Sequence, residues 1–111
     1  MIRLGARGAC RKSHMQESEN PVFMSEVTKA PGTLGMSKQR LLVLTSKPRL
    51  IYINPADNVL KGEIPWSSDL VVEVKSPAKF DIKTPSRVYV LEANKPISRE
   101  WESQIKKKLL A

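Results

Sequence analysis

The sequence predicts a mainly β protein: a seven-stranded antiparallel barrel or sandwich, capped by one C-terminal amphipathic α-helix. Three observations support this prediction. From residue 21 onward, short runs rich in β-branched and aromatic residues alternate with turn-sized gaps. Helical periodicity appears only after residue 96. The chain has 111 residues, 41% of them apolar, which suits one domain with its own core.

The expected strands are separated by residues that favour turns. Pro55 presets its own φ in the segment 54–58, and Asp57 tolerates turn conformations. In the run 79–83 the alternation is clean, with Phe80 and Ile82 facing one way and charged residues facing the other. The expected strands are residues 21–29, 40–45, 49–54, 59–64, 70–74, 79–83 and 87–92.

The C-terminal segment 96–110 is predicted to be the helix. Pro96 suits the first turn of a helix. Apolar residues recur every fourth position and form one stripe with charges around it. The stripe consists of Ile97, Trp101, Ile105 and Leu109. We expect this helix to cover an open end of the barrel, with Trp101 as its large buried anchor.

Residues 1–20 show no sustained periodicity and are expected to be a disordered or linker leader before a domain at 21–111. The first twelve residues carry four basic side chains and no acid, which also resembles a transit peptide. Transit peptides are rich in serine, whereas Ser13 is the only serine before residue 18, so the leader is the preferred interpretation.

Composition narrows the function classes. The net charge of +8 indicates a polyanionic partner, such as phospholipid headgroups, nucleic acid or an acidic protein, or else a basic solubilising surface. Cys10 is the only cysteine and His14 the only histidine, so neither an internal disulfide nor a Cys/His zinc site is expected. No apolar run approaches the roughly 20 residues that span a bilayer, so any membrane contact should be peripheral. Nucleic-acid binding is not expected, because the few aromatic residues are needed in the core.

Three stretches carry a specific resemblance. They are "LIYINPADNVLKGEIPWSSDL" (50–70), "KFDIKTPSRVYVLE" (79–92) and "REWESQI" (99–105). They resemble the pleckstrin-homology (PH) domain at the C-terminus of the 3-phosphoinositide-dependent protein kinase family. The resemblance covers roughly residues 22–109 and implies a PH-type barrel.

The resemblance also implies a function. It implies a phosphoinositide-binding membrane-recruitment module for phosphatidylinositol 3,4,5-trisphosphate or 3,4-bisphosphate. Such a module is cytoplasmic, monomeric and without cofactor, is recruited to the plasma membrane, and has headgroups and the anionic membrane surface as partners. The kinase motifs H-R-D and D-F-G are absent, so this chain should catalyse nothing. It is either the C-terminal PH domain of a serine/threonine kinase, with a kinase domain as a partner in the same chain, or a free-standing relative.

Candidate binding residues follow from the resemblance. Lys29 matches the lysine of the family's first strand, and Lys38 with Arg40 matches its basic pair on the second. Positions 38 and 40 point the same way on a strand, and the planar fork of Arg40 suits phosphate oxygens. Further candidates implied by the resemblance are Lys61, Arg87 and, as a hydroxyl donor, Tyr52.

Each candidate also has a purely structural interpretation. Lys29 and Lys38 can be solvated loop charges, Tyr52 can be a packing residue, Arg40 can pair with an acid such as Asp81, and Lys61 and Glu63 can offset each other. Lys38 stands where the family has an arginine, and the loop residues Pro31, Gly32 and Thr33 stand where it has further bases. The alternative function is therefore a protein-interaction scaffold on a PH fold with a degenerate lipid pocket.

Overall fold

The computed structural model describes residues 14–30 and 37–110. Within these residues it contains seven strands and one helix, which confirms the predicted mainly β fold class. The elements are β1 (Pro21–Lys29), β2 (Lys38–Thr45), β3 (Leu50–Asn54), β4 (Val59–Ile64), β5 (Val71–Val74), β6 (Lys79–Lys83), β7 (Val88–Ala93) and α2 (Ser98–Leu110). Most of the expected leader, and the loop residues Pro31, Gly32 and Thr33, lie outside the described residues.

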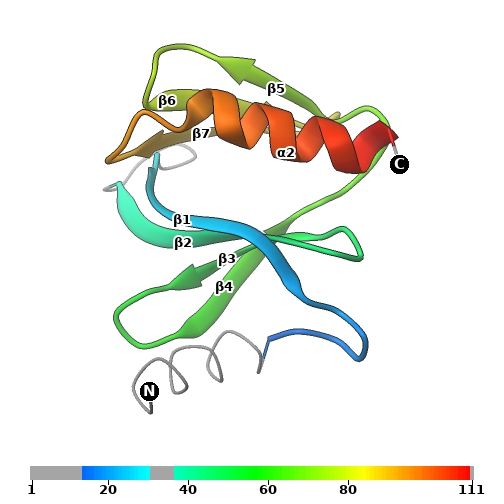
Figure 1. Ribbon diagram of the computed structural model, residues 1–111. Coiled ribbons are helices and arrows are strands. Elements are labelled where there is room, and N and C mark those ends of the chain that lie inside the picture. Colours follow the sequence, from blue (N-terminus) through cyan, green and yellow to red (C-terminus); the bar gives the residue numbers. More distant parts are fainter. Residues whose placement is uncertain (1–13, 31–36, 111) are drawn as a thin grey trace.

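The strands form a single antiparallel sheet in the order β4-β3-β2-β1-β7-β6-β5. β1 pairs with β2 from Pro21 to Lys29, whereas β7 pairs only with the last three residues, Val27–Lys29. The sheet folds over at this short junction, so that β1–β4 and β5–β7 form two facing halves with α2 beside the upper one (Figure 1). In the described part of the chain, no helix has the length and apolar composition needed to cross a bilayer.

Two element boundaries differ from the sequence expectation in ways that matter. β2 begins at Lys38 rather than at Arg40, because Lys38 pairs with Lys29 across the β1–β2 ladder. α2 begins at Ser98 rather than at Pro96, because its first backbone hydrogen bond runs from the Trp101 N–H to the Ile97 carbonyl, 3.0 Å away. Pro96 therefore precedes the helix.

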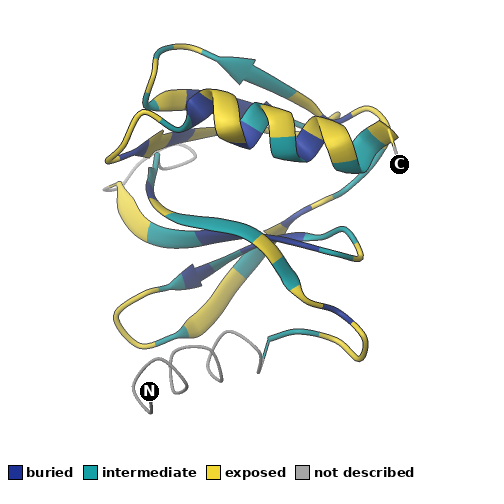
Figure 2. Ribbon diagram, viewed as in Figure 1, coloured by how far each residue is buried: buried dark blue, intermediate teal, exposed yellow. Residues whose placement is uncertain are grey.

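Alternate residues of the two halves fill the core, and α2 adds its apolar stripe (Figure 2). Trp101 is fully buried, as the sequence predicts. Its ring packs edge-on against Phe23, with centroids 4.6 Å apart, and stacks on Phe80 at 6.1 Å. Its Nε1–H donates to Ser25 Oγ at 3.0 Å, which satisfies the indole polar group inside the core.

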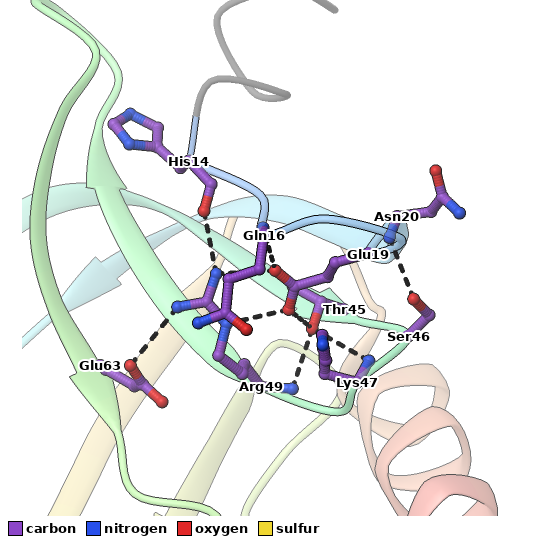
Figure 3. Close-up of polar contacts among 9 residues, drawn as sticks. All are labelled: His14, Gln16, Glu19, Asn20, Thr45, Ser46, Lys47, Arg49 and Glu63. Atoms are coloured by element: carbon purple, nitrogen blue, oxygen red, sulfur yellow. Dashed lines mark hydrogen bonds and ion pairs between the residues drawn. The ribbon is translucent and has the colours of Figure 1, made fainter.

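Residues 14–20, part of the leader expected from the sequence, lie against the turn between β2 and β3 (Figure 3). The Glu19 carboxylate is buried and accepts two hydrogen bonds from Arg49, at 2.9 and 2.8 Å. Thr45 donates its hydroxyl to the same carboxylate, and Arg49 also donates to the His14 carbonyl at 2.9 Å. One buried ion pair therefore fastens this segment to the sheet.

A second apolar cluster lies on the outer side of the sheet. Val43, Ile51 and Ile53 are fully buried there, because Met15 and Met24 pack against them. The N-terminal segment thus covers sheet surface that would otherwise face water.

The Glu19–Arg49 pair predicts a specific pH dependence of stability. The hydrogen bonds from Arg49 lower the pKa of Glu19 from 4.5 to about 2, although burial opposes this change. The ionised carboxylate therefore contributes about 3 kcal/mol above pH 5, and this contribution is lost as the pH falls from 4.5 towards 2. Urea unfolding should show Glu19→Gln about 3 kcal/mol less stable at pH 7, with a difference less than half as large at pH 3.

The exposed Glu17 supplies the matched control, since Glu17→Gln removes a carboxylate from the same segment without touching Arg49. A Glu19→Gln deficit of equal size at both pH values would show that the charge of Glu19 does not stabilise the fold.

Candidate functional site

The inner face of the sheet carries three cations, Lys29, Lys38 and Arg40, where β1 ends and β2 begins. Val27 and Leu42 are buried core residues on these strands. Lys29 lies two residues after Val27, and Arg40 lies two residues before Leu42, so both continue the core-facing side. The register places Lys29 opposite Lys38. The core therefore ends here in basic rather than apolar side chains.

Tyr52 supplies the first aromatic wall of this site. It pairs with Gly62 of β4, and a Cβ atom at Gly62 would collide with the Tyr52 hydroxyl and ring. The phenol therefore lies directly over the Gly62 backbone, a position that only glycine permits. The Lys29 Nζ lies 5.2 Å from the centroid of the same ring, within cation–π range.

Tyr89 of β7 supplies a second aromatic ring beside the cations, a residue that was not among the candidates predicted from the sequence. Its ring is buried and its centroid lies 5.9 Å from the Lys29 Nζ. The Arg87 guanidinium carbon lies 4.5 Å from the same centroid. The sequence does contain an indication of this role. Tyr89 lies two residues before Leu91 and two after Arg87, so strand alternation places all three side chains on the core face. One ring thus contacts two cations from opposite halves of the sheet.

The cations perturb one another and the phenol. Burial lowers the pKa of Lys29, and the charges of Arg87 and Arg40 lower it further. Burial, followed by the nearby Tyr89, raises the pKa of Tyr52, while Arg87 and Arg40 oppose that rise. Lys29, Arg40 and Arg87 therefore lie close enough to repel each other.

No carboxylate neutralises this cluster within the described residues. The structural alternatives for Arg40 and Lys61 are not found there: Asp81 lies 3.9 Å from Lys75, and Glu63 lies 3.6 Å from Arg49. Arg40 instead donates to the Gln39 carbonyl at 2.8 Å, which leaves most of its donors available.

Lys61 does not contact the cluster within the described residues. The β3–β4 register shifts between Tyr52, opposite Gly62, and Ile53, opposite Leu60, so Lys61 is the extra residue of a β-bulge. Its side chain is exposed and makes no recorded contact with the other candidates. The structure therefore brings together Lys29, Arg40, Arg87 and Tyr52, sets Lys38 directly beside Lys29, and shows no contact between Lys61 and these residues in the described part of the chain.

This arrangement suits one chemistry. Ammonium and guanidinium groups converge on a partly desolvated surface with a phenol hydroxyl beside them. Such groups bind a compact, multiply charged oxyanion, because each phosphate oxygen accepts a charge-assisted hydrogen bond. Arg40 and Arg87 offer planar forks, and Lys29 acts as a point charge between them.

Two kinases are similar to this chain in sequence. It is 41% identical over 97 residues to the probable serine/threonine-protein kinase pdkA of Dictyostelium discoideum, and 40% identical over 78 residues to human 3-phosphoinositide-dependent protein kinase 1. These matches cover 87% and 70% of this chain, which spans only 14% of the length of either relative.

Solved structures agree on the fold. The PH domain of human TBC1 domain family member 2 matches with a TM-score of 0.66 and 26% identity, covering 79% of this chain and 80% of that one. The C-terminal PH domain of human pleckstrin matches with a TM-score of 0.63 and 22% identity, covering 85% and 83%. The sequence profile of the PH domain family matches residues 11–110. The chain therefore belongs to the PH domain family.

Proposed function

We propose that this PH domain binds phosphoinositide headgroups, those of phosphatidylinositol 3,4,5-trisphosphate or 3,4-bisphosphate, and thereby recruits the protein to the inner surface of the plasma membrane. The observation that carries the proposal is the cluster of Lys29, Arg40 and Arg87. These three cations lie close enough to repel one another, and no carboxylate among the described residues neutralises them.

The proposal explains why the fold tolerates this repulsion. Bringing like charges together in a partly buried place costs free energy, which shows in the lowered pKa of Lys29. A bound polyphosphate reverses the sign of the local field and favours the protonated amine. The apolar body of each tyrosine ring excludes water and still attracts the ammonium group through its face.

The size of the effect is adequate for a recruitment module. Charge-assisted hydrogen bonds contribute roughly 1.5–3 kcal/mol each. Four of them contribute about 6–12 kcal/mol, against an association cost of about 4 kcal/mol or more. Attraction to an anionic leaflet adds about 1 kcal/mol for each nearby cation, and the exposed Lys38, opposite Lys29, can supply it.

The two kinase relatives indicate which kind of protein could contain this domain. Both named relatives are kinases of which this chain matches a small part. We infer that the domain serves either as the membrane-recruiting part of a serine/threonine kinase, with the kinase domain in the same chain, or as a free-standing monomer with the same binding site.

Arg40→Ala tests the proposal directly. Liposomes doped with phosphatidylinositol 3,4,5-trisphosphate should co-sediment the wild-type protein but not the variant. The melting temperature should not fall, because among the residues that the structure describes the Arg40 side chain donates a hydrogen bond only to the adjacent Gln39 carbonyl. Lys47→Ala is the matched control, since Lys47 is an exposed cation in the turn at the other end of β2. Equal sedimentation of both variants would show that the cluster does not bind the lipid.

A double-mutant cycle tests the aromatic wall. Gly62→Ala should displace the Tyr52 ring and weaken binding of soluble inositol 1,3,4,5-tetrakisphosphate a few-fold, since a cation–π contact contributes about 0.5–1 kcal/mol. In a Tyr52→Leu background the same change should cost no further affinity. Isothermal calorimetry of the four proteins gives the coupling. Additive losses would mean that Gly62 acts independently of Tyr52.

A further inference from the structure

The N-terminal half of β1 has an open edge. The Ala30 N–H donates to the Val90 carbonyl of β7 at 3.0 Å. Alternate residues of an antiparallel strand direct their backbone groups to the same side, so Glu26 and Met24 also direct theirs away from β2. No β7 residue pairs with either of them, because the β1–β7 ladder covers only Val27–Lys29.

The path of β7 explains why the edge stays open. The Ala93 N–H donates to the Ala78 carbonyl at 2.8 Å and the Ser98 N–H to the Pro77 carbonyl at 3.0 Å, so the chain after Ala93 follows the β5–β6 turn rather than β1. The chain then passes through Asn94 and Lys95 into α2, above β1 (Figure 1). The described residues therefore leave two backbone donors and two acceptors of β1 facing a gap in the ladder.

A groove runs along this edge. One cleft of about 430 Å³ is lined by Phe23, Ser25 and Ile97 among others, and a second of about 260 Å³ by residues that include Thr28 and Glu92. Glu26 and Asn94 line both clefts, so the two adjoin along β1. The groove follows β1 for six residues, from Phe23 to Thr28, which is about 20 Å of extended chain.

The two ends of the groove differ in chemistry. At one end the floor is apolar and rigid, because Phe23 packs on Trp101 and Ser25 accepts the Trp101 hydrogen bond. The second cleft carries two exposed carboxylates, Glu26 at the junction with the first cleft and Glu92 beyond it. Neither has an ion-pair partner in the part of the chain that the structure describes, although Lys79 is the register neighbour of Glu92. Lys95 lines the first cleft and not the second. An acidic groove end in a protein of net charge +8 favours a cationic group there and disfavours phosphate.

We propose that this groove binds an extended peptide segment of a partner protein, which adds to β1 as a further strand. Its backbone pairs with Met24 and Glu26, an apolar side chain lies over Phe23, and a lysine or arginine lies between Glu26 and Glu92. This function goes beyond lipid binding and does not depend on it, since the Lys29 cluster lies on the inner face of the sheet. A membrane-bound domain can therefore hold both ligands at once.

Hydrogen exchange tests the open edge itself. In the free protein, the amides of Met24 and Glu26 should exchange at least about tenfold faster than those of Ser25 and Val27, which point towards β2. Equal protection of all four amides would mean that the edge is already paired, and would overturn the proposal.

Selection identifies the ligand class. A phage-displayed library of short random peptides should yield binders that combine aliphatic and basic residues and that slow exchange at Met24 and Glu26. N-methylation of alternate peptide bonds should abolish their binding, because it removes the donors of the new ladder. Recovery of no peptides, or of peptides that leave both amides unprotected or that compete with inositol tetrakisphosphate, would contradict the assignment.

A charge-matched pair of variants completes the test. The double variant Glu26→Gln/Glu92→Gln should bind the selected peptides about tenfold more weakly. Glu17→Gln/Glu100→Gln removes the same charge from exposed positions outside the groove and should bind as the wild type does. Equal affinities of the two double variants would show that no basic side chain binds at the acidic end. Both should bind phosphoinositide vesicles normally, which separates this inference from the proposed lipid function.

Discussion

The position of β1 as the strand shared by both halves of the sheet determines the rest of the architecture. Lys29, at its end, is opposite Lys38 on one side and opposite Leu91 on the other. It is therefore the point at which side chains from β2 and from the start of β7 converge. Arg40 and Arg87, distant in sequence, become neighbours because each is placed relative to this one residue. The same short junction leaves the N-terminal half of β1 without a strand on its second side.

Charged side chains are neutralised beside the β2–β3 turn but not where β1 ends. Beside the β2–β3 turn, the buried Glu19 carboxylate is matched by Arg49 and Thr45, so that burial of charge stabilises the fold. Where β1 ends, Lys29 lies among like charges, and its attractive contacts within the described residues are with two tyrosine rings. Satisfied polar groups are expected where residues serve structure, and local violations of that rule are expected where they serve function. This contrast within one small domain supports a binding role for the cluster of Lys29, Arg40 and Arg87.

Much of the fold follows from local patterns in the sequence. Period-two alternation in the short runs predicts the strands, and the stripe through Trp101 predicts a helix that packs on them. The placement of Lys38 and Arg40 on one face follows from the same alternation once β2 is a strand. These features are local, because each depends on residues only a few positions apart.

What the sequence did not predict depends on contacts between distant segments. The docking of residues 14–20 requires Glu19 to meet Arg49, which lies thirty positions later. The β-bulge that makes Lys61 an extra, exposed residue is a property of the β3–β4 register, and the period of the sequence does not encode it. Tyr89 looks like an ordinary core aromatic until Lys29 and Arg87 are seen on its face. Gly62 acquires its role only when Tyr52 is placed across from it.

The most direct test of the central claim is a titration of the isotopically labelled domain with soluble inositol 1,3,4,5-tetrakisphosphate, followed by NMR. If the headgroup binds at this cluster, saturable shifts should be largest for the amides of Lys29, Arg40, Tyr52, Arg87 and Tyr89, with little change at Glu19 and Arg49. An absence of shifts at these five positions at millimolar ligand, or saturable shifts confined to other parts of the molecule, would contradict it.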